Sequence, residues 1–230
     1  MKQIIAIAID GPGGAGKSTV ARRVADRLNI LYLDTGAMYR ACGLKASRLG
    51  LKKEDVPGIE EMLGQTKVDV RFVDDEQHVF LDDEDVTELI RTPEISVWAS
   101  DISAVSACRL MLVKAQRDIA SNRSVVMDGR DIGSYVLPDA NVKIFLTASV
   151  KERAARRYAE LRERGEEASY ESVLADLNYR DHQDTNRSFA PLVCAKDAVC
   201  LDTTEMDVEE TVNAVLDLVS KFIEGTGRHG

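Results

Sequence analysis

This 230-residue sequence has few of the features that mark a membrane protein, a disulfide framework or a nucleic-acid-binding surface. No apolar run reaches the roughly 18 residues that a transmembrane helix requires. The four cysteines form no CxxC pair and show no zinc spacing, so we expect free thiols in the cytoplasm. With 5% aromatic residues and a net charge of -9, the chain is poorly suited to stacking on bases or coating a polyanion. We therefore expect no nucleic-acid and no membrane partner.

Short apolar runs alternate with amphipathic helical stretches along most of the chain. The expected strands are β-branched or aliphatic, which is typical of a parallel sheet buried on both faces. They are Ile4–Ile9, Ile30–Leu33, Val125–Met127, Val142–Leu146 and Ala198–Leu201. This order predicts an α/β fold with a doubly wound parallel sheet of five strands and right-handed crossovers.

The helices carry their own start signals. Ser149 with Glu152, and Asp207 with Glu210, match the capping-box pattern, in which two side chains bond each other's backbone N–H groups. Thr92–Glu94 matches a cap followed by proline at the first helical position.

Two stretches depart from the alternation. Between Lys67 and Ile90, hydrophobic and polar residues alternate on both sides of the polar segment Asp74–Gln77, which predicts an antiparallel hairpin with its turn there. Residues 153–187 are rich in arginine and are interrupted by Gly165, which predicts two helices joined by an exposed turn. We therefore expect one domain over residues 1–230, with its core at 1–64, 91–152 and 188–224, a β insert at about 65–90 and an arginine-rich region at about 153–187.

A phosphate loop follows the first expected strand. Residues Gly11–Ser18 read GPGGAGKS and match GxxxxGK[ST] between a strand and an amphipathic helix, as the mechanism requires. Backbone N–H groups and the helix N-terminus favour a phosphate chain, Lys17 reaches the β- and γ-phosphates, and the Ser18 hydroxyl ligates Mg²⁺. The residues expected to bind the nucleoside triphosphate, which the family resemblance described below implies is ATP, are Gly11, Pro12, Gly13, Gly14, Ala15, Gly16, Lys17, Ser18 and Thr19. GTPases, ATPases and kinases share this loop, so it predicts nucleotide binding and leaves the reaction open.

Two further segments follow expected strands. Thr35 is expected to cap the helix after the second strand and to place Arg40 about one and a half turns in, although an ordinary cap with a solvated arginine fits equally. Asp128 closes the central strand, where phosphate-loop proteins hold a metal-bound water. Arg130 and Asp131 come next, at the sheet edge where open α/β folds bind ligands, although a salt bridge within the loop is the alternative.

The segment Arg180–Arg187 places Arg180, Asp184 and Arg187 on one helical face, at steps of four and three residues. Two cations and a carboxylate on one face suit a phosphate and a ribose hydroxyl. A surface charge ladder is the alternative, and spacing alone does not choose between them.

Together these segments resemble the bacterial-type cytidylate kinase family. IAIDGPGGAGKST, YLDTGAMYR, VFLDDEDVTELIRTPE, VVMDGRDIG, PDANVKIFLTAS and RDHQDTNRSFAPL are similar to its signatures, in its order and over essentially the whole chain. The resemblance implies the P-loop nucleoside monophosphate kinase fold, with a nucleotide-binding insert and a helical lid at 153–187. It also implies transfer of the γ-phosphate of ATP to CMP or dCMP, with Mg²⁺ as cofactor.

The resemblance implies a role for individual residues as well. Arg40, Arg130 and Arg187 would bind the CMP phosphate, Arg180 would lie near the reacting phosphates, and Asp184 would contact the ribose. Ser100, Arg109 and Asp131 would bind cytosine, whose amino donor and ring acceptors suit a carboxylate and a guanidinium. Thr35 belongs to the substrate set, Arg157 is an expected ATP contact in the lid, and Lys17, Arg180 and Arg187 form the catalytic set.

The acceptor phosphate is mostly deprotonated at neutral pH, so no general base is expected and catalysis rests on positioning and charge neutralisation. A monomer is expected. Two alternatives stay open: a kinase of the same architecture that takes AMP, UMP or another small acceptor, and a GTPase-like switch, although no guanine-binding NKxD sequence is present.

Overall fold

The computed structural model describes residues 4–73 and 76–227. Its large sheet has five strands in the order β2-β6-β1-β7-β8, and every neighbouring pair is parallel. The strands are β1 (Ala6–Asp10), β2 (Leu31–Asp34), β6 (Val125–Gly129), β7 (Val142–Thr147) and β8 (Val199–Asp202). This confirms the predicted doubly wound parallel sheet, with strand ends displaced by at most two residues. Because β1 lies between β6 and β7, the loops after these strands meet at one edge of the sheet.

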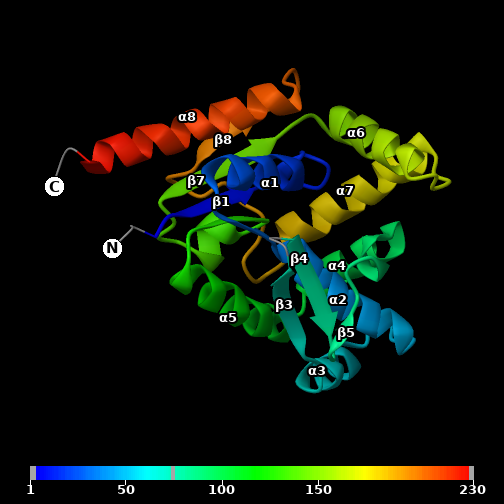
Figure 1. Cartoon of the computed structure of the whole chain (residues 1–230). Helices are drawn as coiled ribbons and strands as arrows, with labels where there is room; N and C mark the ends of the chain where they lie inside the picture. Colours follow the sequence, from blue (N-terminus) through cyan, green and yellow to red (C-terminus); the bar gives the residue numbers. More distant parts are fainter. Residues whose placement is uncertain (1–3, 74–75, 228–230) are drawn as a thin grey trace.

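Helices cover both faces of the large sheet (Figure 1). Alternate residues of β1 separate the two layers: Ile7 and Ile9 pack with α1 (Lys17–Leu28) and α8 (Val208–Gly227), while Ala8 faces the layer that holds α5 (Ser106–Asn122). The three β1 side chains are fully buried, which explains why the strand is apolar on both faces.

The predicted antiparallel insert is confirmed as a small sheet of β3 (Val68–Val73), β4 (Glu76–Leu81) and β5 (Glu84–Asp85). The predicted turn was too long, because Glu76 and Gln77 already pair in β4 with Val73 and Phe72. Asp74 and Asp75 lie outside the described residues. The small sheet packs beside α2 (Thr35–Arg48). Along the chain it is preceded by α3 (Val56–Gly64) and followed by η1 (Leu89–Arg91) and α4 (Pro93–Ser103).

The arginine-rich region forms the two predicted helices, α6 (Val150–Glu163) and α7 (Tyr170–Asn186), and Gly165 in the turn has a φ of 73°. A further short helix, η2 (Ile132–Val136), follows β6. Thr92 caps α4 as predicted, since its side chain accepts a hydrogen bond from the Ile95 N–H.

Of the two predicted capping boxes, one is complete. Asp207 and Glu210 each accept a hydrogen bond from the other's N–H. At Ser149 only half of the box forms, because the Glu152 carboxylate pairs with Arg156 and the Ser149 N–H donates to Thr204 Oγ1 instead.

Within the described residues, no single helix is long and apolar enough to cross a membrane. The pair formed by α4 and α5, bent by 100°, passes the same test of length and composition.

Candidate active site

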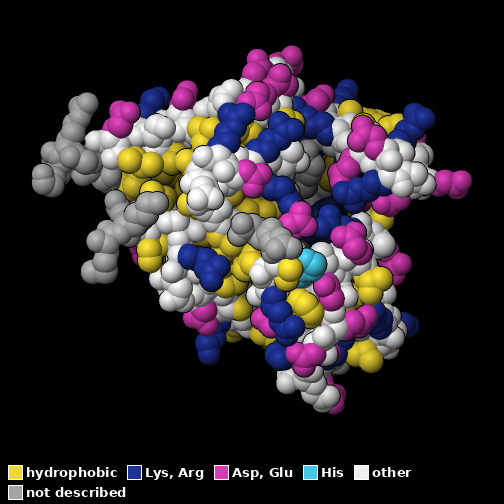
Figure 2. Space-filling view, viewed as in Figure 1, with side chains coloured by type: hydrophobic (Ala, Val, Ile, Leu, Met, Phe, Trp, Pro, Cys, Tyr) yellow, Lys and Arg dark blue, Asp and Glu magenta, His cyan; other side chains and the backbone are white. Residues whose placement is uncertain are grey.

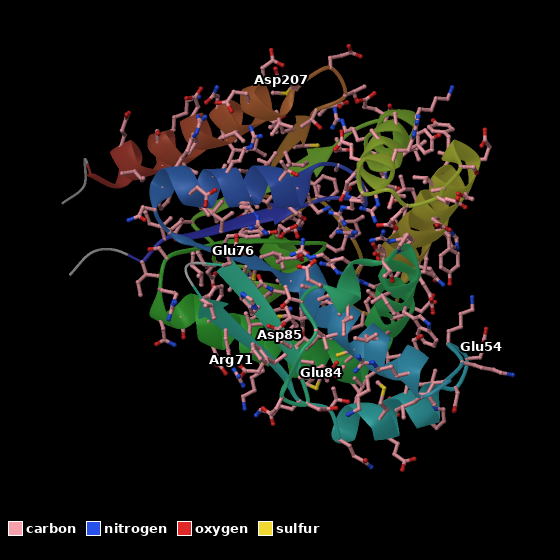
Figure 3. The ribbon with its side chains drawn as sticks, turned by 45° about the vertical axis from the view of Figure 1, so that its right-hand side comes forward. Glu54, Arg71, Glu76, Glu84, Asp85 and Asp207 are labelled. Carbon is pink, nitrogen blue, oxygen red and sulfur yellow. The ribbon has the colours of Figure 1, made fainter. Side chains whose placement is uncertain are left out.

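A cleft of about 890 Å³ opens at the edge where β1 and β6 end. Its lining includes Gln77 of the small sheet, the phosphate loop (Gly11–Ser18) from Gly13 onward, and Asp207 before α8. Figure 2 shows Lys and Arg side chains gathered around a hollow, and Figure 3 shows Asp207 near α8 well away from Glu76 and Asp85 on the small sheet. Except for Gly11 and Pro12, every residue that the sequence nominated for the site lines this cleft.

The phosphate loop is shaped by close packing against the sheet. Gly11 has a φ of 147°, and a Cβ atom there would collide with the Leu146 carbonyl, so only glycine fits. The loop leads into α1 at Lys17, whose Nζ donates a 2.7 Å hydrogen bond to the Pro12 carbonyl. Burial, followed by the charge of Arg130, lowers the pKa of Lys17 to about 7. An anion in the loop would counter both effects.

Ser18 and Asp128 meet across 110 residues of sequence, because β1 and β6 are neighbours in the sheet. Ser18 Oγ donates to Asp128 Oδ2 at 2.9 Å, and the Tyr32 hydroxyl donates to Oδ1 at 3.0 Å. Burial, followed by the negative charge of Asp34, raises the pKa of Asp128 to about 6. The carboxylate therefore lies where a nearby cation would stabilise its charged form.

The helix after β2 begins differently from the prediction. Asp34 is the N-cap, accepting a 3.0 Å hydrogen bond from the Ala37 N–H, whereas Thr35 is already helical and its Oγ1 donates to the Asp128 carbonyl at 2.7 Å. The prediction of a Thr35 cap was wrong, because an aspartate one position earlier takes the same role. Arg40 lies 2.7 Å from Asp34 Oδ2, so it is paired rather than freely solvated.

The Asp184 carboxylate accepts hydrogen bonds from two other segments of the chain. Arg130 Nε donates to Asp184 Oδ2 at 2.8 Å, and Ser100 Oγ donates to Oδ1 at 3.4 Å. Burial opposes ionisation of Asp184, but Arg130, Arg187 and Arg180 outweigh it and lower its pKa. Asp184 is 4% exposed, so these contacts do not form a solvated surface ladder.

Arg187 is the residue immediately after α7, with extended ψ of 141°, rather than part of the helical face that the spacing suggested. Its Nε donates to the Ala190 carbonyl at 2.7 Å, and its Nη1 donates to Ser103 Oγ at 3.2 Å. The side chain is nevertheless buried close to Asp184, with its Nη1 at 3.9 Å from Asp184 Oδ1.

Arg130 and Asp131 do not pair with each other as the alternative of a loop salt bridge supposed. Asp131 Oδ2 instead accepts a hydrogen bond from Arg109 Nη2, and its Oδ1 lies 3.4 Å from Arg187 Nη2. Arg109 and Asp131 are 1% and 3% exposed. A buried polar pair thus lies in the wall of the cleft.

Arg180 also lines the cleft, but it forms no ion pair with a carboxylate in the part of the chain that the structure describes. Its Nε is buried and has no hydrogen-bond partner within residues 4–73 and 76–227. Burial, followed by the charge of Arg130, lowers the pKa of Arg180 to about 10. A Cβ atom at Gly13 would lie 3.8 Å from the guanidinium carbon of Arg180, so this cation lies against the phosphate loop.

Arg157 lines the cleft from α6 and is paired with Glu160 at 2.7 Å. The structure also adds polar neighbours that the sequence analysis did not nominate: Tyr32, Asp34, Ser103 and Arg153. Only Asp34 had a usable signal, since aspartate is at least as good an N-cap as threonine. For the described residues, no group of three His, Cys, Asp or Glu side chains is placed to hold a metal ion.

A phosphate loop on a parallel sheet, facing a cleft lined with arginines, defines a P-loop kinase. The family model for cytidylate kinase matches residues 7–221. The chain belongs to the cytidylate kinase family, which is a family of nucleoside monophosphate phosphotransferases.

Curated relatives agree with this assignment. The chain is 48% identical to a cytidylate kinase of Caldicellulosiruptor bescii, over 96% of this chain and 97% of that one. It is 50% identical to a cytidylate kinase of Pediococcus pentosaceus, over 93% and 94%.

Among solved structures, a gluconokinase from Sinorhizobium meliloti is similar in fold, with a TM-score of 0.53, 13% identity and coverage of 98% of this chain and 97% of that chain. At that identity the likeness shows the fold alone.

Proposed function

We propose that this chain transfers the γ-phosphate of ATP to the phosphate of CMP or dCMP, giving ADP and CDP or dCDP. The observation that carries the proposal is the convergence of cations from separate segments on one cleft. Lys17 lies at the start of α1, Arg130 follows β6 and Arg180 lies in α7, and all three line the cleft beside the phosphate loop. Two polyanions that repel each other need such a cluster before they can react.

The two nucleotides would occupy opposite sides of the phosphate loop. ATP would lie on Gly11–Thr19, with Arg157 as a further phosphate contact. On the acceptor side, Arg40, Arg130 and Arg187 would bind the CMP phosphate, with Thr35 beside them, and Asp184 would contact the ribose. Ser100, Arg109 and Asp131 would bind cytosine. Planar guanidiniums suit these positions, because they bind phosphate and carboxylate oxygens through two N–H groups at once.

The division of the chain follows from this assignment. The small sheet at about 65–90 would be the nucleotide-binding insert, and its Gln77 Oε1 accepts a 2.7 Å hydrogen bond from the Asp34 N–H at the edge of the cleft. The helices over 153–187 would form a lid. Closing a lid removes water that could otherwise accept the phosphoryl group.

Mg²⁺ fits the oxygens that the site presents. Asp128 and Ser18 offer hard oxygen donors 2.9 Å apart, and Asp128 is a buried carboxylate with a raised pKa. Ser18 would hold the ion directly and Asp128 would hold it through water. When bound, Mg²⁺ neutralises charge on the phosphates.

The remaining chemistry is done by positioning. The acceptor oxygen is mostly ionised at neutral pH, because the second pKa of a phosphate monoester is about 6. No protein base is therefore needed. Lys17, Arg180 and Arg187 would align donor and acceptor in line and stabilise charge spread over the transferring phosphoryl group. We propose that the enzyme acts as a monomer in the cytoplasm, where its nucleotide substrates are available.

A monophosphate panel tests the proposal. With ATP as donor, ADP release is measured in a coupled assay for CMP, dCMP, UMP, AMP and GMP. We expect CMP and dCMP to give the highest kcat/KM. A preference for AMP would overturn the cytosine contacts at Asp131 and Arg109, and GTP binding without any phosphoryl acceptor would favour the switch alternative.

A further inference from the structure

Arg180 lies between two residues that are each held by a different part of the molecule. On one side, the Tyr179 hydroxyl donates to Asp101 Oδ1 of α4 and accepts hydrogen bonds from Gln183 Nε2 at 3.0 Å and Lys53 Nζ at 3.2 Å. On the other side, the Asp181 carboxylate lies 2.8 Å from Arg153 Nη2 of α6. The backbone on both sides of Arg180 is thus tied to neighbouring helices.

Arg153 connects this carboxylate directly to the phosphate loop. Its Nη1 donates to the Gly13 carbonyl at 2.8 Å, and its Nε donates to the Ala148 carbonyl at 3.0 Å. The residue is 6% exposed, so a single buried guanidinium joins the loop, the end of β7 and α7. Only the fork of an arginine reaches three acceptors in this way, since a lysine ammonium is a compact point charge.

Arg180 needs such support because burial and neighbouring cations outweigh the attraction of Asp184 and lower its pKa to about 10. It is half-buried beside the like charge of Arg130, and its buried Nε has no hydrogen-bond partner in the described part of the chain. Both guanidiniums lie 3.8 Å from where a Cβ atom of Gly13 would be. Contacts that fix the helix on both sides of Arg180 would therefore help to keep its guanidinium over the loop.

We propose that the Arg153–Asp181 ion pair and the Tyr179–Asp101 hydrogen bond are positioning contacts that hold Arg180 over the phosphate loop before the nucleotides bind. This inference rests on the proposed phosphoryl transfer. Arg153, Asp181, Tyr179 and Asp101 do not line the cleft. They would fix α7 so that the Arg180 charge is already in place when the phosphates arrive. A preorganised cation costs no rearrangement during the reaction, whereas a displacement of about 1 Å can cost about 10²-fold in rate.

Two isosteric variants test each contact separately. Asp181→Asn removes the charge that holds Arg153, and Tyr179→Phe removes the hydroxyl that reaches Asp101. We expect each to lower kcat by about 10- to 100-fold, while KM for CMP changes by less than about threefold because the acceptor contacts remain. Asp176→Asn is the matched control, since Asp176 is exposed on the same helix, and it should leave both constants unchanged.

A double-mutant cycle separates positioning from general support of the fold. If Asp181 acts through Arg180, then Asp181→Asn should have no further effect on kcat once Arg180 is alanine. Arg153→Lys, which keeps the charge but loses the fork, should retain part of the activity. The proposal is overturned if the losses of kcat caused by Asp181→Asn and Arg180→Ala multiply in the double variant. It is also overturned if Asp181→Asn and Tyr179→Phe both keep the wild-type kcat, or if they raise KM with kcat unchanged. An inactive wild type in the monophosphate panel would instead reject the proposed function.

Discussion

Replacing Arg180 with alanine is expected to lower kcat by about 10³-fold or more, the scale found for arginines that stabilise a transferring phosphoryl group. The same change should leave Tm unchanged or raise it slightly. Arg180 is half-buried, and burial, followed by the charge of Arg130, lowers its pKa to about 10, so the folded protein disfavours its charge. Removing the side chain therefore relieves repulsion in the free enzyme while it removes a cation from the reacting phosphates.

The measurement is kcat by ADP release together with Tm by calorimetry. Arg162→Ala is the matched control, because Arg162 lies on α6, exposed and outside the cleft lining, and it should change neither value appreciably. A variant that keeps full activity would mean that Arg180 is not a catalytic residue. A large fall in Tm in parallel with kcat would mean that Arg180 mainly stabilises the fold.

Asp131→Ala, unlike Arg180→Ala, is expected to reduce stability as well as activity. Asp131 is the carboxylate that pairs with Nη2 of Arg109, which is 1% exposed and whose Nε has no hydrogen-bond partner in the described residues. Deleting one member of a buried ion pair leaves the other charge uncompensated, at a cost of about 3–5 kcal/mol in the free energy of unfolding. Since Asp131 is also a proposed cytosine contact, kcat/KM for CMP should fall by about 10²-fold or more.

Urea denaturation gives the stability, and the CMP to UMP ratio of kcat/KM, measured well below Tm, gives the base selectivity. Asp139→Ala is the control, since Asp139 is an exposed aspartate further along the same connection and should leave both unchanged. A variant that loses stability but keeps the wild-type selectivity would show that the Arg109–Asp131 pair supports the fold without binding cytosine.

The framework of this fold was predictable because it rests on local patterns. The buried strands, the alternation around β3 and β4, the Thr92 cap and the Gly165 turn each depend on a few consecutive residues, and the structure has all of them. The errors are local too. At Thr35 two good capping residues are adjacent. At Glu76 the strand β4 begins within the polar segment, and the next residue, Gln77, accepts a hydrogen bond from the Asp34 N–H.

The partners of the charged residues were not predictable, because they depend on which strands are neighbours. Ser18 and Asp128 were both expected near Mg²⁺, but their direct hydrogen bond depends on β1 lying beside β6, which no spacing in the sequence shows. The same holds for Arg153, whose contact with Gly13 spans 140 residues. Sequence spacing could suggest that Arg180 and Asp184 share a face, but their burial depends on how α7 packs beside α4 and α6.

The central claim is that both nucleotides lie end to end in one cleft, with their phosphates meeting at the phosphate loop. Titration calorimetry with adenosine and cytidine joined 5′ to 5′ by five phosphates, in the presence of Mg²⁺, tests it directly. The account predicts that one molecule binds per chain, that both ATP and CMP displace it, and that it binds at least about 10²-fold more tightly than CMP alone. Binding no tighter than CMP, or two molecules per chain, would contradict it.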